Sequence, residues 1–312
     1  MINIFGPVPS RRLGKSLGVN NIPYKFCTYA CIYCQIGKAI KIQNKRQTFY
    51  KTEKLVEEVQ SILSYIKSSS EYPDYITIVP DGEPTLDINL GKLIKDLKIF
   101  NVPVAVITNA SLINNADVYR DLLIADYISV KIDTVNENKW HKINKPHRAL
   151  KLNEILDGIQ LFRNDFKGKF VTETMVIKGV NDTIEDFIMV AEFIKKVNPD
   201  IAYLAIPTRP PAFKTVKPAD ENTLNKGACI FSKALLNVAK LSDYEGSDFV
   251  GTDNAEDDLL SITAVHPMRE DAIIKLLNKS NSNWDIVERL IEKGLIQRLH
   301  YEGYNYYLRK FK

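Results

Sequence analysis

Cysteine is scarce in this chain of 312 residues, and long apolar runs are missing. Four cysteines are too few for a disulfide-stapled scaffold, and the longest apolar runs, such as Ile201–Ile206, fall far short of the ~20 residues that cross a bilayer. With 14 Gly, 14 Pro and 45% hydrophobic residues, the chain is neither collagen-like nor disordered. The start lacks a charged segment followed by a long apolar one, so no signal peptide is expected. We therefore expect a soluble cytoplasmic protein with no membrane partner.

Acidic residues are nearly missing from the amino end. Residues 1–54 hold ten Lys/Arg against one acid, Glu53, whereas residues 241–260 hold seven acids and no base. Residues 261–312 hold nine Lys/Arg against six Asp/Glu. This distribution indicates separate functional regions, and a positive mouth would favour an anionic substrate or a polynucleotide. Solvated surface lysines explain the same counts equally well.

Hydrophobic periodicity predicts alternating strands and helices over the first three quarters of the chain. About six strands each precede a helix, which indicates a parallel sheet with fewer repeats than a closed eight-stranded barrel. The fold class predicted is therefore α/β, with a partial (β/α)6 TIM-type barrel over residues 1–242. Functional groups should lie on the loops after the carboxyl ends of the strands. The predicted strands are Ser16–Asn20, Tyr75–Val79, Val104–Thr108, Tyr127–Ile132, Phe170–Ile177 and Ile201–Ile206, and the predicted helices are Glu53–Ser68, Ile88–Phe100, Asn114–Ile124, Glu137–Ile143, Asn153–Asp165, Thr183–Lys196 and Asn222–Leu241.

The pattern changes after an acidic linker predicted over residues 243–260. Met268–Leu277 and Trp284–Lys293 read as short helices, and Leu295–Tyr301 with Tyr304–Leu308 reads as a β-hairpin around Glu302-Gly303. Two helices and a hairpin at the end of a chain outline a small winged helix over residues 261–312. Because the linker lacks apolar periodicity, this tail is predicted to be separable from the barrel.

Three of the four cysteines form a compact motif. Cys27, Cys31 and Cys34 have the spacing C-x3-C-x2-C, which can hold three irons of a [4Fe–4S] cluster and leave the fourth iron without a protein ligand. A zinc site would need a second cysteine pair or histidines at a set distance, and neither follows. Cys229 lies in a predicted helix and is expected to be a small buried residue.

This loop, including Tyr33, resembles the signature of the radical S-adenosylmethionine superfamily, and the resemblance covers about residues 1–240. Asp81-Gly82-Glu83-Pro84 is similar to the Gly-Gly-Glu-Pro segment of that superfamily, with Asp81 in place of the first glycine. The resemblance implies that Glu83 takes the ammonium group of S-adenosylmethionine. It also implies cosubstrate contacts to the ribose and carboxylate after the next two strands and to the adenine after the fifth. The residues at those positions are Thr108, Asn109, Ser129, Lys131, Asp133, Val180 and Asn181.

Two further segments point to one branch of the superfamily. Phe5–Gly14 and Pro207–Ala212, together with the tail, resemble radical S-adenosylmethionine proteins related to the wyosine-forming enzymes of tRNA. Those enzymes carry additional cysteines for a second cluster ahead of the shared loop, and this chain has none before Cys27. The resemblance therefore does not extend to a second cluster or to pyruvate condensation.

The resemblance implies a reaction but not a substrate. A reduced [4Fe–4S] cluster, supplied by a donor such as a flavodoxin or ferredoxin, would cleave S-adenosylmethionine to a 5′-deoxyadenosyl radical that takes hydrogen from the substrate. Arg11, Arg12 and Arg209 are expected near the mouth, where they would bind phosphate or carboxylate or else pair with acids at the rim. The substrate would be a nucleotide or RNA, or alternatively a peptide or protein held by the tail, as in a maturase or a glycyl-radical activase. An iron–sulfur regulator is the third alternative.

The charges of the tail bear on these alternatives. Segment Trp284–Lys293 is net negative by one, which suits a phosphate backbone poorly. The tyrosines of the hairpin would either stack on bases or dock on the barrel. At most weak, salt-sensitive nucleic-acid binding through the hairpin is expected.

Overall fold

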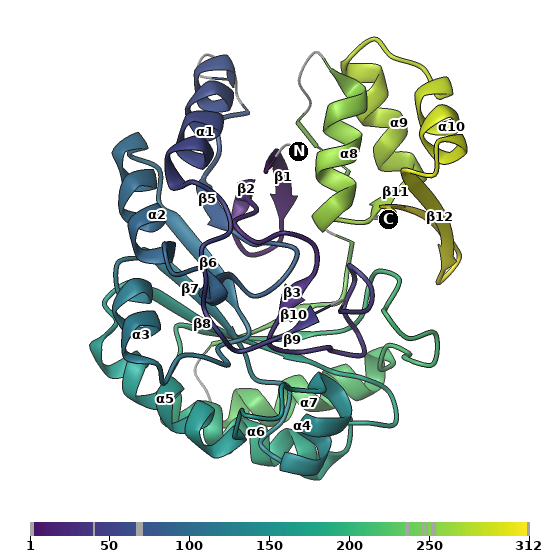
Figure 1. Ribbon diagram of the computed structural model, residues 1–312. Helices are drawn as coiled ribbons and strands as arrows, with labels where there is room; N and C mark the ends of the chain where they lie inside the picture. Colours follow the sequence, from purple (N-terminus) through teal and green to yellow (C-terminus); the bar gives the residue numbers. More distant parts are fainter. Residues whose placement is uncertain are drawn as a thin grey trace.

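Eight strands form one curled sheet, a partial barrel that confirms the predicted fold class (Figure 1). The computed structural model describes residues 3–39, 41–66, 71–234, 237–244, 246–247, 249–250 and 254–310. The first two strands of the sheet pair antiparallel, and every later pair is parallel. In sheet order the strands are β1 (Ile4–Ser10), β2 (Gly14–Val19), β5 (Tyr75–Ile78), β6 (Val104–Thr108), β7 (Tyr127–Lys131), β8 (Lys169–Met175), β9 (Ile201–Ala205) and β10 (Val238–Leu241).

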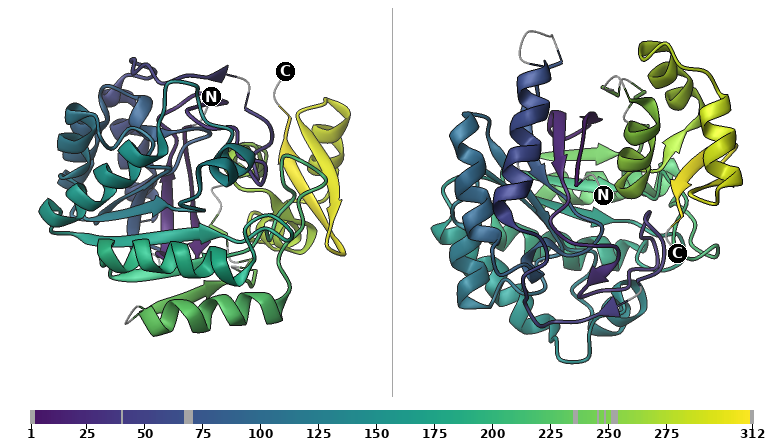
Figure 2. Two further views of the ribbon diagram at one scale, coloured as in Figure 1. Left: turned by 90° about the horizontal axis from the view of Figure 1, so that it is seen from below. Right: turned by 45° about the horizontal axis from the view of Figure 1, so that its top comes forward.

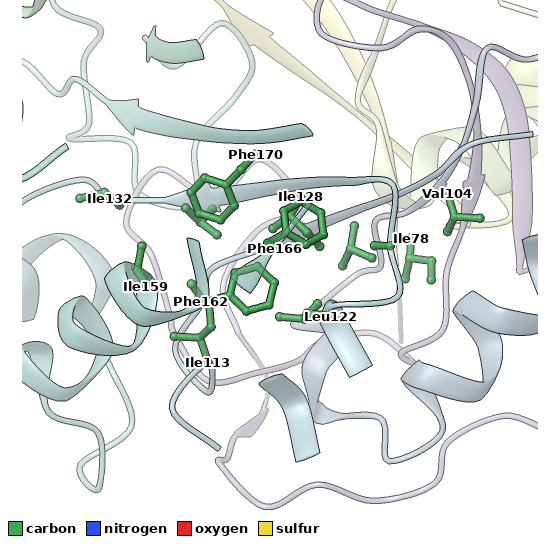
Figure 3. Close-up of a cluster of buried hydrophobic side chains, with 14 of the residues drawn as sticks. Ile78, Val104, Ile113, Leu122, Ile128, Ile132, Ile159, Phe162, Phe166 and Phe170 are labelled. Carbon is green, nitrogen blue, oxygen red and sulfur yellow. The ribbon is translucent and has the colours of Figure 1, made fainter. Parts of the chain in front are cut away.

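Helices cover the outside of this sheet, as Figures 1 and 2 show from three directions. Their buried positions recur at helical spacing, so each helix turns one apolar stripe toward the strands. Figure 3 shows Phe162, Phe166 and Phe170 beside Ile128 and Leu122 in the core between the two layers. The helices are α1 (Thr52–Ile66), α2 (Leu90–Leu97), α3 (Ala116–Leu122), α4 (Glu137–Asn144), α5 (Leu152–Asp165), α6 (Ile184–Val197) and α7 (Glu221–Ala234), with short 3-10 turns η1 (Pro84–Leu86) and η2 (Lys98–Phe100).

Two strands of the sheet differ from the sequence prediction. β1 was not predicted, because Gly6, Pro7 and Pro9 are typical of a loop; here the segment is an edge strand, where proline is tolerated. The prediction of one helix over Asn222–Leu241 is wrong, since α7 ends at Ala234 and Val238 pairs with Ala202 as the start of β10. Residues 235–236, and residues 67–68 of the first predicted helix, lie outside the described residues.

The tail has the element order of a winged helix, with a three-stranded sheet in the order β11-β13-β12. Both predicted helices and the predicted hairpin are present, with slightly shifted bounds. The elements are α8 (Ala255–Val265), β11 (Met268–Arg269), α9 (Glu270–Lys279), α10 (Asp285–Glu292), β12 (Ile296–Tyr301) and β13 (Tyr304–Arg309).

The predicted linker is wrong for its last six residues, which begin helix α8. The Asn254 side chain caps this helix by accepting a hydrogen bond from the Asp257 N–H, and the acids of the linker fill its first turn. Negative charge at a helix N-terminus is stabilising, so the same acidic run that indicates a solvated linker also suits a helix start. Residues 245, 248 and 251–253 of the predicted linker lie outside the described residues.

The tail packs tightly on the barrel. Phe5 and Val8 of β1 share one buried cluster with Leu259 and Ile262 of α8, and Figure 1 shows α8 beside β1. Tyr301 Oη donates a hydrogen bond of 2.9 Å to the carbonyl of Pro207. Tyr306 Oη donates one of 2.8 Å to the carbonyl of Thr208. These contacts argue against a tail that separates freely, because removing it would expose the apolar side chains of β1.

Membrane crossing finds no support in the fold. Within the described residues, no helix combines the length and the apolar character that a bilayer span requires.

Candidate active site

A cavity of about 300 Å³ lies at the carboxyl ends of the parallel strands. All three cysteines of the predicted cluster motif line it, together with Gly82, Glu83, Thr108 and Asn109 from the loops after β5 and β6. Arg11 and Arg12 come from the turn between β1 and β2, Lys131 from the end of β7 and Arg209 from the loop after β9. The structure thus brings together residues that span the first two thirds of the chain.

Backbone hydrogen bonds fix the cysteine loop between the barrel and α4. The loop runs from β3 (Phe26–Cys27) to β4 (Lys41–Ile42), which pair with each other. The Ala30 N–H donates to the carbonyl of Asn144, and the Ile32 N–H donates to that of Ile143, both at 2.9 Å. The end of α4 therefore determines where the three thiols point.

Each thiol has a hydrogen-bond donor nearby. Lys25 Nζ lies 3.1 Å from the Cys34 Sγ, Asn144 Nδ2 3.4 Å from the Cys31 Sγ, and Asn109 Nδ2 3.7 Å from the Cys27 Sγ. Burial raises the pKa of Cys27 to about 12 and also raises that of Cys31, so these groups hold their protons unless a cation replaces them. Amide and ammonium donors of this kind stabilise the negative charge of metal-bound thiolates.

The arrangement of these thiols fits an iron–sulfur cluster better than a single metal ion. In the part of the chain that the structure describes, no three His, Cys, Asp or Glu side chains converge on one ion. A [4Fe–4S] cluster binds each thiolate through a different iron, so its ligands need no common point. Cys27, Cys31 and Cys34 would hold such a cluster at the wall of the cavity.

Gly82 allows the loop after β5 to touch the cysteine loop. A Cβ at this position would lie 1.7 Å from the carbonyl oxygen of Phe26, and this oxygen also accepts a hydrogen bond of 3.0 Å from the Glu83 N–H. Because the obstacle is backbone, no larger residue fits without moving the segment that carries Cys27. Pro84, at the start of η1, is buried and does not line the cavity.

The carboxylate of Glu83 binds its own chain. Its Oε1 accepts from Thr85 N–H at 3.2 Å, from Thr85 Oγ1 at 2.6 Å and from Thr108 Oγ1 at 2.5 Å, and its Oε2 accepts from the Asn109 N–H at 2.9 Å. Burial raises the pKa of Glu83, and these hydrogen bonds oppose the shift. Among the described residues, Oε2 accepts one hydrogen bond, and Glu83 lines the cavity, so its contact with an ammonium group stays a prediction.

Cations outnumber acids in the cavity wall. Lys131 and Arg12 both pair with Glu173 of β8. Burial lowers the pKa of Lys131 to about 8; the charge of Asp133 opposes this shift, and the charge of Arg12 adds to it. Two cations on one carboxylate leave a net positive charge at this side of the cavity.

The winged helix also contributes to the cavity wall, through His266, which directly follows α8. Arg209 Nη2 lies 2.6 Å from His266 Nε2, and Arg209 also donates to Gln35 of the cysteine loop. Burial, and then the charge of Arg11, lower the pKa of Arg209 to about 9. Burial, and then the charge of Arg209, hold the pKa of His266 well below its usual value, so His266 is neutral and accepts.

Several predicted cosubstrate residues lie behind the cavity wall. Ser129, Asp133, Val180 and Asn181 do not line the cavity. Ser129 is fully buried in β7, so the expected contact from its side chain is not supported. Asp133 and Asn181 instead position other groups: Asp133 accepts from Tyr33 Oη at 2.6 Å, and Asn181 Nδ2 donates to the Asp133 carbonyl at 2.8 Å. Tyr33 itself lines the cavity.

Gln35, His266 and Glu173 are among the wall residues that sequence reasoning missed. Gln35 and His266 gave no local signal, because their role depends on the docked tail. Glu173 did give one, since a charged residue stands in the middle of a predicted buried strand. Cys229 was expected to be buried, but it is exposed on α7.

Comparisons with known proteins identify the family. The family profile described as Radical SAM superfamily matches residues 21–194, more than half of the chain. The chain belongs to the radical S-adenosylmethionine superfamily. Enzymes of this superfamily use a [4Fe–4S] cluster and S-adenosylmethionine and need an electron donor, so the predicted enzyme class and cofactors are confirmed.

This radical S-adenosylmethionine protein is similar to the following relatives and solved structure. It is 45% identical over 310 residues to the UPF0026 protein MJ1312 of Methanocaldococcus jannaschii, covering 99% of this chain and 96% of that one. It is 20% identical over 283 residues to the S-adenosylmethionine-dependent nucleotide dehydratase of Flammeovirga pacifica, covering 90% and 88%. A structure of TYW1 with a lysine-pyruvate adduct has a TM-score of 0.55 at 16% identity, over 72% of this chain and 76% of that one, which shows a shared fold.

Proposed function

We propose that the cavity is the site at which S-adenosylmethionine is cleaved reductively and at which the resulting radical takes hydrogen from a nucleotide, free or within RNA. The observation that carries the proposal is that Cys27, Cys31 and Cys34 share one cavity with Arg11, Arg12 and Arg209. The cluster, when bound, supplies the electron that breaks the S–C5′ bond. The chain holds the cluster, orients the cosubstrate and keeps water away from the reactive carbon.

We assign cosubstrate binding to two lining residues, Asn109 and Lys131. Asn109 lines the cavity at the end of β6, and its amide also donates to Thr28 Oγ1 at 2.8 Å, so its position is fixed. Lys131 also lines the cavity and is suited to a carboxylate, since its own partner Glu173 is shared with Arg12. Glu83 acts as a brace that holds Asn109 at this place.

The charge balance of the cavity favours an anionic substrate. Arg11, Arg12, Lys131 and Arg209 line it, against two carboxylates, Glu83 and Glu173. Buried cations are costly unless they are paired. An incoming phosphate or carboxylate would supply the missing negative charge, and the arginine fork suits either group.

The relatives favour a nucleotide among such anions. The relative from Flammeovirga pacifica is named as a nucleotide dehydratase that depends on S-adenosylmethionine, and the match covers most of both chains. A cavity of about 300 Å³ suits single groups rather than a duplex, so an RNA substrate would have to insert one unstacked nucleotide.

The winged helix is proposed to close the cavity rather than to read nucleic acid. His266 enters the wall, and the hydroxyls of Tyr301 and Tyr306 bind the barrel, so these tyrosines are not available as a stacking platform. The exposed face of α10 carries Asp285, Glu288 and Glu292 against Arg289, a net negative surface that suits phosphates poorly. A peptide substrate is the alternative that this acidic face leaves open.

Anaerobic turnover with defined compounds tests the proposal. The reconstituted protein is incubated with S-adenosylmethionine, dithionite and either mononucleotides, a tRNA pool or a peptide mixture, and 5′-deoxyadenosine is measured. We expect phosphate-bearing compounds to raise its release above the rate without substrate. Arg209→Gln should reduce this increase, whereas Arg120→Gln on the exposed face of α3 should not. Stimulation by peptides alone would refute the nucleotide proposal.

A further inference from the structure

Three segments around the cysteine loop carry many cations and no acids. Residues 22–52, 138–153 and 201–219 together hold 14 Lys/Arg and no Asp or Glu. The rest of the chain therefore holds 28 Lys/Arg against 38 acids, so it is net negative. Arg46, Lys139 and Lys151 pair with acids outside these segments, and the other cations leave an excess of positive charge on the part of the chain that carries the cysteines.

Direct contacts join these three segments. The Ala30 N–H lies 3.2 Å from the carbonyl of Lys145, and the Phe213 N–H donates to the carbonyl of Ile32, also at 3.2 Å. Lys145 Nζ and Lys38 Nζ lie 4.3 Å and 4.9 Å from the centre of the Phe213 ring. Lysines from two of the segments thus meet over an aromatic ring of the third.

Four exposed lysines form what we call the cationic rim: Lys38, Lys41, Lys145 and Lys214. Lys41 belongs to β4 and lies 5.1 Å from the centre of the Phe26 ring, next to Cys27. Within the described part of the chain, no acid forms an ion pair with any of the four. Their charges are therefore directed to solvent and to whatever binds there.

An exposed apolar side chain lies within this rim. Ile42 pairs with Cys27 between β4 and β3, and it is 40% exposed. Ile32 and Phe213, which a backbone hydrogen bond joins, are half-buried, and Lys38 and Lys145 cover the Phe213 ring. A small apolar centre with a charged edge is the usual anatomy of a protein–protein contact, and an aliphatic side chain offers no stacking surface to a base.

The side of the cysteine loop that faces the cavity already contacts other parts of the chain. There the thiols face the cavity, where Gln35 contacts Arg209 and the winged helix adds His266. Ile42 and the cationic rim do not line the cavity, so they leave a route to the cysteine loop for a protein that delivers electrons.

We propose that the cationic rim and Ile42 form the docking surface for an acidic one-electron carrier protein. The inference rests on the proposed function, because it assumes a cluster on Cys27, Cys31 and Cys34. In each encounter one electron leaves the reduced carrier and enters the cluster, and no bond or proton is transferred. Charge complementarity steers the encounter and raises its rate by about 10- to 1,000-fold at low salt.

The test compares two variants of equal charge change. The rim variant carries Lys38→Glu, Lys41→Glu, Lys145→Glu and Lys214→Glu. The control carries the same change at four exposed lysines on α6 and α7, namely Lys195, Lys196, Lys226 and Lys233. Each reconstituted protein is titrated calorimetrically with oxidised flavodoxin, and 5′-deoxyadenosine formation is driven either by reduced flavodoxin or by dithionite.

We expect the rim variant to bind flavodoxin at least ~10-fold more weakly than the control and to lose a similar factor in the flavodoxin-driven rate, with the dithionite-driven rate unchanged. Wild-type binding should weaken with salt, and binding by the rim variant should not. Equal binding in the two variants would overturn the proposal. So would loss of the dithionite-driven rate in the rim variant, or loss of tRNA binding with flavodoxin binding intact.

This design separates the two proposals. Failure of the wild-type protein to form 5′-deoxyadenosine with dithionite would refute the proposed function. The calorimetric titration would still report whether the cationic rim binds the carrier.

Discussion

Replacing Glu83 by Ala should destabilise the fold before it affects cosubstrate binding. The change removes the acceptor of the buried Thr85 N–H, of the part-buried Asn109 N–H, and of two hydroxyls that can rotate to other partners. A buried donor left without a partner costs ~1–3 kcal/mol and a part-buried one less, so the two N–H groups together predict a loss of about 1–6 kcal/mol in the free energy of unfolding. Glu83→Gln keeps one oxygen and should cost about 1–3 kcal/mol, mainly at the Asn109 N–H.

Urea unfolding of the cluster-free protein measures these losses, and iron per chain after reconstitution measures their effect on the site. We expect Glu83→Ala to lower iron content as well, because Asn109 contacts the Cys27 thiol. Glu57→Ala, on the exposed side of α1, is the matched control and should change stability by less than ~0.5 kcal/mol. If Glu83→Ala lost less than ~1 kcal/mol and kept its iron while S-adenosylmethionine binding weakened, the bracing role would be refuted.

Three further outcomes follow from the same contacts. His266 is neutral in the fold and binds a proton in the unfolded chain below pH ~6.5, so the free energy of unfolding should fall as the pH drops below that value. Urea unfolding at pH 5.5 and 7.5 should show a smaller fall in His266→Gln than in the wild-type protein. Equal falls would contradict this prediction. Truncation before Asn254 should make the protein insoluble or markedly less stable to heat, because it exposes Phe5 and Val8; a soluble truncated chain with full iron would contradict the packing role. Cys31→Ala should abolish the reducible cluster and Cys229→Ala should not, as iron analysis and electron paramagnetic resonance would show, and a cluster in Cys31→Ala would refute the ligand assignment.

The regular parts of the barrel follow from local sequence. The buried strands β6 and β9 are runs of apolar residues whose bounds the sequence predicts to within one residue. β1 and β10 could not be predicted in this way, because neither has an unambiguous local pattern. The prolines of β1 are tolerated only because it is an edge strand, and β10 follows α7 with too short a break for periodicity to detect.

The site was predictable where it depends on motif order. Parallel strands bring their carboxyl ends to one rim, so the cysteine loop, Gly82 and Arg209 could be placed around one cavity before any contact was known. The direction of a single carboxylate could not, since Glu83 faces Thr108 and Asn109 only once β5 and β6 are paired. His266 joins the cavity wall because the winged helix docks on the barrel. The acidic run before this domain had indicated a linker and a separable tail, so the docking could not be predicted.

Product analysis under anaerobic conditions tests the central claim, that the cavity lined by Cys27, Cys31 and Cys34 cleaves S-adenosylmethionine. The reconstituted protein is incubated with S-adenosylmethionine and dithionite, beside the Cys31→Ala variant. We predict equal amounts of 5′-deoxyadenosine and methionine from the wild-type protein and neither product from the variant. A wild-type protein that binds its full complement of iron and forms no 5′-deoxyadenosine, or a variant that still forms it, would contradict the account.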